Sequence, residues 1–579
     1  MNKIAWAIFL LFQGCLFGQE KLMLPEIDTI GLNYRAGGVG LDSVDAVNVG
    51  KINLRPAGGF GETYEYNLPE NLFQSPGGIS YRTTDMKVKP LYIGLPYLGF
   101  QYAFGSALNQ ALNLEYHQFY DENTHLHFRY HRRTSNGLLR NGDFKLNDLS
   151  LLFFHSSGKW STKLDAYYGA YNYAENSGIT TDTLIEEFDI EFTPVIRENA
   201  RSEVRKLDAL WENYYQVLSI SERKAGLKSR HNYTLTGRVY TENPLNQDLV
   251  ENIYIDSFST RDQYQTASIS NGLGIYLAGS NVAWDVTLNH RYWRNQNLGL
   301  NRDTIEAFVH SNFHLKWNKV ILKNEFYANF LGALGEMYNH ASLGIKPVRK
   351  MDVQLAFRFD NRLPLPYQRF HEANNIRWDL SSLELQQILN FSGSIRYGAT
   401  NYIRASVNWT SVNNGLYFIN NDWRQDTLDL VSAGKLSLGA AYHLGSWSFY
   451  PGVSVGFNTD NFSYQPLFST LNRIAYKTKL FKARRLGFTI GLDAGYSLGY
   501  QFMHYNTLLS VMEPVQTQTD APDLVKLNVF TALKIEEFRF FIRGENLDYF
   551  INDQTSRIDL NYPIMPFIVR IGVTWDFFN

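Results

Sequence analysis

Residues 125–133 read HLHFRYHRR, and every second side chain in this stretch is basic or can coordinate a metal. The five side chains are His125, His127, Arg129, His131 and Arg133. Successive strand residues point to opposite faces, so these five would share one face while Leu126, Phe128 and Tyr130 share the other. Imidazoles on one face could bind a transition metal, but the interleaved guanidinium groups oppose a cation. The spacing therefore favours a basic stripe that attracts anions, and we expect no metal site.

The sequence gives little support for an enzyme, since it contains no P-loop and no H-E-x-x-H motif. Nothing singles out a nucleophile with its base, so we expect neither an enzyme nor a bound cofactor. The formal net charge of −2 argues against nucleic acid as a partner. An acidic cluster comprises Glu186, Glu187, Asp189 and Glu191. These residues could bind divalent cations that bridge lipopolysaccharide, although a solvated loop is the favoured interpretation.

The composition points to strands. Aromatic residues reach 15% while charged residues make up only 19%, and Tyr, Phe and Trp favour strands over helices. The mean hydropathy of −0.28 excludes a bundle of transmembrane helices, which needs runs of about 20 apolar residues.

Residues 1–18 have the layout of a secretory signal peptide. Lys3 precedes an apolar run that is too short to span a bilayer, and Gly18 ends a plausible cleavage site. The only cysteine, Cys15, lies inside this segment. A lipoprotein anchor is the less favoured interpretation of Cys15, because the residues before it fit a lipobox poorly. The mature chain then has no cysteine and no disulfide.

From about residue 90 to the C-terminus, polar and apolar residues alternate in runs of about nine to eleven, the length of a tilted transmembrane strand. Several polar faces carry full charges in mid-strand, which a dry core would not accept unpaired. We therefore expect these faces to line a water-filled lumen. Besides the basic stripe, the predicted pore-lining residues are Asp285, His314, Lys316 and Arg404.

Connections between the runs alternate in length. Short ones are expected at 121–124, 156–159, 316–319 and 534–537, and long ones at 175–210, 243–260, 363–380, 414–431, 501–521 and 550–563. Outer-membrane barrels show this asymmetry, with short periplasmic turns and long outer loops. We predict an all-β fold, a single antiparallel transmembrane β-barrel of about 20–22 strands over residues 91–579.

Residues 19–90 are rich in Gly, Pro and Asn and show little alternation. A periplasmic extension is the favoured interpretation. The alternative is a segment that enters and narrows the lumen, because a barrel of this many strands is wide enough to need occlusion.

The last strand, RIGVTWDFFN, has an apolar face that lipid would cover. It resembles the assembly signal of outer-membrane barrels at Arg570, Gly572, Trp575 and Phe577. The chain departs from that signal by continuing for two residues after the final aromatic. The resemblance implies insertion by the barrel-assembly machinery, with outer-membrane lipid and lipopolysaccharide as surroundings.

Two longer stretches resemble the "putative porin" β-barrel family of Gram-negative outer membranes, namely residues 96–144 and the stretch from FFIRGENLDYF to the C-terminus. The segment YNYAENSGI at 171–179 lies where that family has an Asn-Gly-Gly-like turn, here changed to Asn176-Ser177-Gly178. The stretch from FFIRGENLDYF to the C-terminus is also similar to the close of TonB-dependent receptor barrels. The resemblance implies a location in the cell outer membrane.

The expected function is a porin-like channel for passive or weakly selective passage of small polar solutes. The alternative is a receptor- or transporter-like barrel, or a surface anchor whose long loops bind a partner protein or glycan. A TonB-dependent receptor is disfavoured because the N-terminal segment is shorter than the usual plug and has no clear energy-coupling box. The sequence leaves open whether the chain forms a homo-oligomer.

Overall fold

The computed structural model describes residues 96–121, 123–137, 139–180, 189–220, 223–419, 422–426, 430–459, 466–499, 503–514, 523–551, 557–559, 561–563 and 566–578. The signal peptide predicted for residues 1–18 and the segment 19–90 lie outside these ranges. Among the residues so described, no helix is long and apolar enough to cross a membrane.

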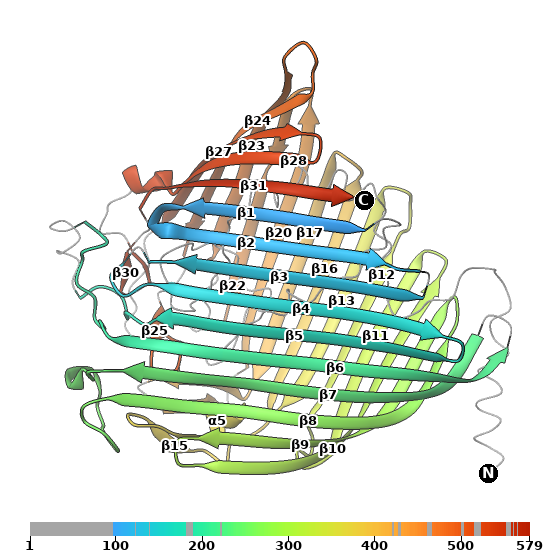
Figure 1. Cartoon of the computed structure of the whole chain (residues 1–579), viewed down its shortest axis with the longest axis vertical. Helices are drawn as coiled ribbons and strands as arrows, with labels where there is room; N and C mark the ends of the chain where they lie inside the picture. The colour runs from blue at the N-terminus through green and yellow to red at the C-terminus, as the bar shows by residue number, and fades with distance from the viewer. Residues whose placement is uncertain are drawn as a thin grey trace.

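Antiparallel strands close into one barrel (Figure 1). Strands that are adjacent in the chain pair with each other, and the first strand, β1, pairs with the last, β31. The sheet contains 23 strands. Two of these, β21 and β22, each pair with both β20 and β23 and together form one strand position interrupted at Pro451. The barrel therefore has 22 strand positions, which confirms the prediction of 20–22.

The barrel strands are β1 (Tyr97–Gly105), β2 (Asn109–Phe119), β3 (Thr124–Ser135), β4 (Phe144–Ser157), β5 (Trp160–Ala174), β6 (Ala200–Ile220), β7 (Arg223–Glu242), β8 (Thr260–Ala278), β9 (Val282–Asn297), β10 (Asn301–Trp317), β11 (Val320–Leu331), β12 (Met337–Ile345), β13 (Met351–Arg362), β16 (Gln386–Gly398), β17 (Tyr402–Asn413), β20 (Val431–Leu444), β21 (Trp447–Tyr450), β22 (Gly452–Asn458), β23 (Phe468–Leu480), β24 (Leu486–Leu498), β27 (Leu524–Ile535), β28 (Phe538–Glu545) and β31 (Ile568–Phe578). The loops add four hairpins, formed by β14 (Phe370–Glu372) with β15 (Arg377–Asp379), β18 (Gly415–Ile419) with β19 (Asp422–Asp426), β25 (Met503–Asn506) with β26 (Val511–Pro514), and β29 (Arg557–Asp559) with β30 (Tyr562–Pro563). Short helical segments are η2 (Ser106–Leu108), η3 (Gln247–Leu249), α5 (Pro366–Arg369) and η4 (Leu547–Phe550).

The short predicted connections all lie at the barrel end where β31 finishes, and the long ones lie at the opposite end (Figure 1). We call these the turn end and the loop end. One predicted boundary was wrong: the loop expected at 175–210 ends earlier, because β6 begins at Ala200. The first outward-facing residues of β6 are charged, and Arg201 pairs with Asp143 at 2.6 Å. Here the outward side chains are charged and the inward ones are Ala200, Ser202 and Val204, so the start of the strand lacks the apolar outer face by which the sequence reveals a membrane strand.

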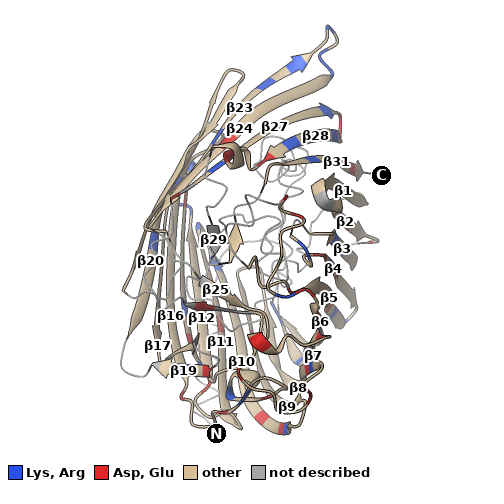
Figure 2. Cartoon of the chain, turned by 90° about the vertical axis from the view of Figure 1, so that its left-hand side faces the viewer, with Lys and Arg blue, Asp and Glu red and all other residues tan. Residues whose placement is uncertain are grey.

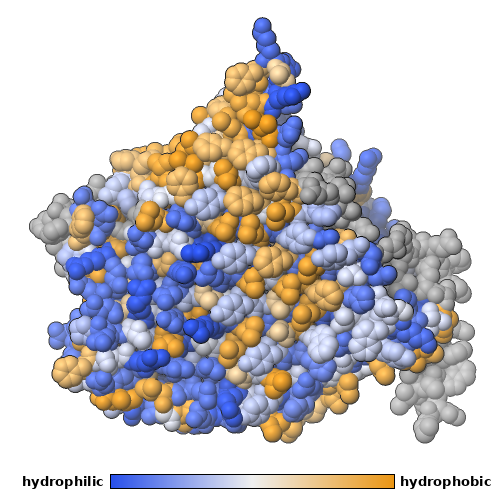
Figure 3. Space-filling model, viewed as in Figure 1, coloured by the Kyte–Doolittle hydropathy of each residue, from blue (hydrophilic) through white to orange (hydrophobic). Residues whose placement is uncertain are grey.

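The outer face of the barrel is apolar, as the alternation predicts. Leu288 on β9 and Ile403 on β17 are 60% and 48% exposed, whereas their neighbours Asp285 and Arg404 face the lumen. Figure 3 shows apolar side chains over the middle and upper strands and a mostly hydrophilic loop end on the left. Exposed aromatic residues at or near the turn end of their strands are Trp160, Trp317, Tyr397, Tyr442, Trp447 and Trp575. They form the girdle typical of a membrane interface.

Buried polar residues stabilise the seam where β1 pairs with β31 and closes the sheet. On β31, Arg570 is fully buried and donates to Glu545 of β28 and to Asn109 of β2, at 3.2 and 2.7 Å. The Tyr97 hydroxyl of β1 donates to Asp576 at 2.6 Å. The inner face of the last strand therefore ties together the strands on both sides of the closure.

We predict that the outer face of β31 is required for insertion. Trp575 is 44% exposed and stacks on Phe577 at 4.3 Å between ring centroids, so both rings meet lipid. Replacing both with Asp should remove the folded barrel from outer-membrane fractions, because carboxylates on the lipid face oppose insertion. Heat-modifiable migration on gels measures the folded amount.

The matched control is Trp575→Phe with Phe577→Leu, which keeps the face apolar and should leave the folded amount unchanged. Equal heat-modifiable migration for the Asp variant and the wild type would contradict the placement of this face in lipid.

Candidate functional site: the lumen and its loop cap

A cavity of about 1440 Å³ occupies the lumen. The residues that line it belong to β3 to β7, β9 to β13, β16, β17 and β20. Several of these side chains lie close to the turn end of their strands, such as His125 on β3 and Arg404 on β17. The cavity therefore reaches into the turn-side half of the barrel.

The predicted pore-lining residues divide into two groups. Those on the cavity wall are His125, His127, Asp285, His314 and Arg404. Those that share the inner face of their strands but lie off this wall are Arg129, His131, Arg133 and Lys316. A role of either group in permeation stays a prediction.

The basic stripe on β3 has acidic neighbours that one strand alone cannot reveal. Asp148 of β4 lies 3.4 Å from the His131 imidazole. Glu115 of β2 lies directly across from Arg129 and contacts His117 at 2.7 Å. The stripe therefore carries a weaker positive field than its own sequence predicts.

Two histidines lie in close contact in the same region. The Nδ1 atoms of His117 and His127 approach to 2.5 Å. Within the described ranges, no group of three or more His, Cys, Asp or Glu side chains is arranged to hold a metal. In the predicted acidic cluster, Glu186 and Glu187 lie outside the described residues.

A buried ion-pair cluster crosses three strands on one side of the cavity. The Lys228 ammonium on β7 lies 2.9 Å from Glu212 on β6 and 2.9 Å from Asp285 on β9. Asn312 of β10 donates a further hydrogen bond to Asp285 at 3.3 Å. Asp285 was predicted as a pore-lining charge, and it does reach the wall, but its charge is shared with Lys228.

The next strands carry a second paired network. Glu325 of β11 contacts His310 at 3.1 Å and accepts a hydrogen bond from Tyr338 at 2.8 Å. On β13, Asp360 contacts both His340 and Arg358. The carboxylates in these two networks are therefore held by cationic or hydroxyl partners, which fixes the side chains that border the cavity.

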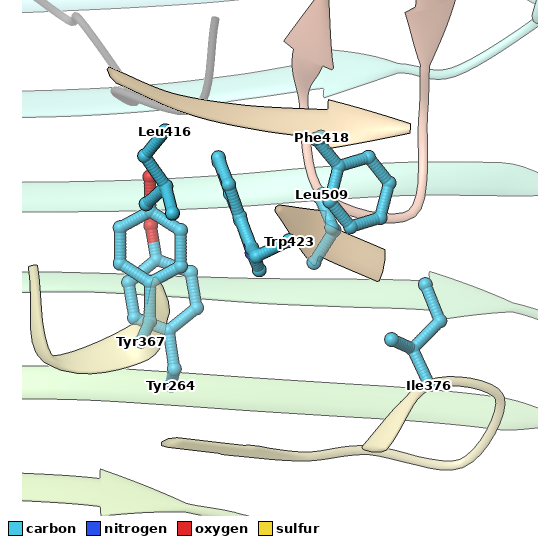
Figure 4. Packing of buried hydrophobic residues seen from close by; sticks show 7 residues of the cluster. All are labelled: Tyr264, Tyr367, Ile376, Leu416, Phe418, Trp423 and Leu509. Atoms are coloured by element: carbon cyan, nitrogen blue, oxygen red, sulfur yellow. The ribbon is translucent and has the colours of Figure 1, made fainter. Parts of the chain in front are cut away.

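At the loop end, the long loops fold inward and pack together as a cap. Figure 2 shows β25 and β29 between the two walls of the barrel. The hydrophobic core of the cap comprises Tyr264, Tyr367, Ile376, Leu416, Phe418, Trp423 and Leu509, all shown in Figure 4. Tyr264 belongs to the wall strand β8 and stacks on Tyr367 of α5 at 5.1 Å between ring centroids. The cap is therefore packed onto the barrel wall as well as onto itself.

One buried ion pair anchors the β25–β26 hairpin of the cap. Arg238 on β7 lies 3.2 Å from Glu175, which directly follows β5. The same guanidinium donates to the carbonyl oxygens of Thr507 and Leu508 at the tip of the hairpin. Glu175 also accepts from the Tyr505 hydroxyl at 3.1 Å. Residues about 330 positions apart are thereby joined across the lumen.

The turn Asn176-Ser177-Gly178 continues this anchor. Ser177 and Gly178 have φ of 57° and 84°, the left-handed region in which glycine is least strained. A Cβ on Gly178 would lie 2.2 Å from the Asn561 carbonyl oxygen, so only glycine allows this close approach. The next amide, that of Ile179, donates to that same oxygen at 2.9 Å. The turn thus docks one outer loop against another.

Sequence reasoning missed the two charges of this anchor. Glu175 stands inside YNYAENSGI, the stretch that carries the family resemblance, so a signal for a special position was present. Arg238 gave no signal, because its partners lie about 60 and 270 residues away in the chain.

We predict that Arg238→Met releases the β25–β26 hairpin. Removing one member of a buried ion pair leaves the other uncompensated and costs about 3–5 kcal/mol. Limited proteolysis with mass spectrometry should show faster cleavage within residues 503–514. Adding Glu175→Gln should recover part of the protection, because no orphaned charge is then buried.

Arg294→Ala is the control, since Arg294 pairs with Asp303 at the exposed outer surface. Its cleavage rate should equal that of the wild type. If Arg238→Met also cleaves at the wild-type rate, the ion pair does not hold the hairpin.

We predict that docking of the same hairpin depends on pH. Burial raises the pKa of the Glu513 carboxyl to about 7, although a hydrogen bond from Asn506 acts in the opposite direction. A raised pKa means that the docked state favours the neutral acid. This stabilisation is fully present below the ordinary carboxyl pKa of 4.5 and is lost as the pH rises through about 7.

The hairpin should therefore be cleaved faster at about pH 8 than at about pH 6, after correction for protease activity on an unfolded substrate. Glu513→Gln should abolish the difference. If the cleavage rates of the wild type and the variant depend on pH in the same way, a titratable group other than Glu513 controls docking of the hairpin.

The barrel region is similar to a known protein family. The model of the family described as "Putative porin" matches residues 91–579, the range predicted for the barrel. No curated protein matches the chain.

Solved structures show the fold alone, at low sequence identity. The FrpB iron transporter of Neisseria meningitidis (F5-1 variant, apoprotein form) is 12% identical with a TM-score of 0.55, covering 83% of this chain and 81% of that chain. The ferric-catecholate import receptor Fiu of E. coli K12, in its closed form, is 10% identical with a TM-score of 0.54, covering 84% and 83%. The ferripyoverdine receptor of Pseudomonas aeruginosa is 12% identical with a TM-score of 0.54, covering 84% and 72%.

The likeness to TonB-dependent receptor barrels predicted from the C-terminal stretch is thus confirmed at the level of fold. The family match spans most of the chain and coincides with the closed barrel. This chain belongs to the "Putative porin" family of outer-membrane β-barrels.

Proposed function

We propose that the protein is a channel for small polar solutes, with passive or weakly selective passage through the lumen. The observation that carries this proposal is the cavity of about 1440 Å³ inside a closed barrel, with many ionisable side chains among the apolar ones on its wall. Water solvates such a wall at little cost, whereas a sealed interior would not tolerate it. Pore size and local charge would then set what passes.

We also propose how the protein reaches the outer membrane, and that it catalyses no reaction. Export would use residues 1–18 as a signal peptide, and the barrel-assembly machinery would insert the barrel among lipid and lipopolysaccharide. We assign no enzymatic role and no cofactor, because the paired carboxylates Glu212, Asp285 and Glu325 serve structural contacts. Pairing with neighbouring side chains therefore accounts for these carboxylates without a reaction.

A second candidate is a receptor-like transporter, and the loop cap favours it. The cap joins several loops around one hydrophobic core at the loop end. Structures of similar fold include a protein titled an iron transporter and one titled a ferripyoverdine receptor. In this alternative, a solute would bind the cap from outside and displace it from the lumen.

Single-channel recording in planar bilayers separates the two candidates. The purified full chain should give stable stepwise openings if it is a channel. Arg238→Met should increase the conductance or the open time, because the hairpin it anchors lies across the lumen. Arg294→Ala should match the wild type. A folded barrel that stays silent in both wild type and Arg238→Met would reject the channel and favour the receptor.

A further inference from the structure

The wall formed by β16, β17 and β20 differs in charge from the rest of the cavity. These three strands contain no Asp or Glu. Their inward-facing side chains at the cavity include Arg404, Lys435, Ser392, Ser394, Ser406 and Ser437. We call this set the basic wall. Acidic residues of the cavity lie on other strands, among them Glu212 on β6, Asp285 on β9 and Glu325 on β11.

Strand register places the hydroxyl groups between the two cations. Lys435 lies directly across from Asn408, and Arg404 lies across from Gly439 on the strand of Lys435. Lys435 and Gly439 are four residues apart, or about 13 Å along a strand. Ser437 and Ser406 face each other in the row between them, and Ser394 extends that row onto β16.

The two cations of this wall are not neutralised as Lys228 is. Lys228 has two carboxylates at 2.9 Å. For the described residues, the structure places no carboxylate within ion-pair distance of Lys435 or Arg404. Both remain accessible from the cavity, since Arg404 is exposed and Lys435 is half-buried.

Such a surface has the chemistry to attract and pass anions. Uncompensated positive charge in a cleft with low-dielectric walls raises the local concentration of anions. Serine hydroxyls can donate to an oxyanion along the same row. The stripe on β3 lacks this property, because Glu115 and Asp148 lie among its cations.

We propose that the basic wall makes the lumen selective for small anions, with carboxylates and phosphates as the solute class. This inference rests on the proposed channel function and adds the sign of charge that the channel prefers. The net charge of −2 for the whole chain does not oppose it, because the distribution along the lumen decides the local field.

Ion selectivity gives the first test. In a gradient of potassium chloride, the wild-type channel should show a chloride-to-potassium permeability ratio above unity. Lys435→Gln with Arg404→Gln should lower that ratio several-fold, and the corresponding double Glu variant should lower it further, toward cation preference. Inorganic phosphate should reduce chloride current in the wild type and much less in the Gln variant.

The matched control is Lys482→Glu with Arg485→Glu. It changes the charge as the double Glu variant does, but at exposed positions of the turn between β23 and β24. Its permeability ratio should equal that of the wild type. Heat-modifiable migration confirms that each variant is folded, and the uncharged Gln variant carries the test if the Glu variant does not fold.

A second test does not need conduction. The only cysteine of the chain is Cys15, so Ser437→Cys introduces a single thiol beyond the first 18 residues. An anionic methanethiosulfonate should modify this thiol faster than a cationic one, relative to their rates with free cysteine. The preference should fall several-fold when Lys435→Gln and Arg404→Gln are added.

The outcomes separate the two proposals. A barrel that is silent in both the wild type and Arg238→Met, with a strong anionic preference at residue 437, would reject the channel but retain the anion-attracting wall. A conducting wild type whose permeability ratio and thiol preference do not respond to the Gln variant would reject the wall and retain the channel. No preference at residue 437 in any background would likewise overturn the inference.

Discussion

Closure of the sheet is the constraint on which the rest of this structure depends. In hydrocarbon, each unpaired backbone amide or carbonyl costs several kcal/mol, so no edge strand can be left open. The β1–β31 ladder removes the two edges that the barrel sheet would have if it stayed open. Its side chains reinforce it from within, because Arg570 reaches both β28 and β2 and Tyr97 reaches Asp576. Polar groups can serve here because the seam's inner face points away from lipid.

A second constraint follows from the number of strands. Barrel diameter grows with strand number, so 22 strands enclose a lumen that side chains alone cannot fill. At the loop end, this chain covers the inner wall with its own outer loops. The Arg238–Glu175 pair lies deep between wall and cap, where an unpaired charge would be costly. Toward the turn end, the inner wall stays polar and borders the cavity.

The sequence predicted those features that depend on a single strand and missed those that depend on neighbours. Alternation at 282–289 and 402–410 is a local property, and it predicted correctly which side chains face outward. The cap was not predicted because its contacts join segments hundreds of residues apart. The hydrogen bond from Tyr505 to Glu175 is an example. The positive charge of the stripe at 125–133 was overestimated for the same reason. Its acidic neighbours come from β2 and β4, and register cannot be read from one strand.

The distribution of charge among strands is one tertiary property that the sequence does encode, once the strands are known. From Gln386 to Leu444, the barrel strands contain Arg396, Arg404, Lys435 and no acidic residue, whereas β4 to β11 and β13 each carry both signs. Interleaved charges pair across strands, fix one another and leave little net field. Arg404 and Lys435 have no acidic partner on β16, β17 or β20, so their field extends into the lumen. Packing of the cap would thus govern access to the lumen, while segregation of charge would govern which ions the open lumen favours.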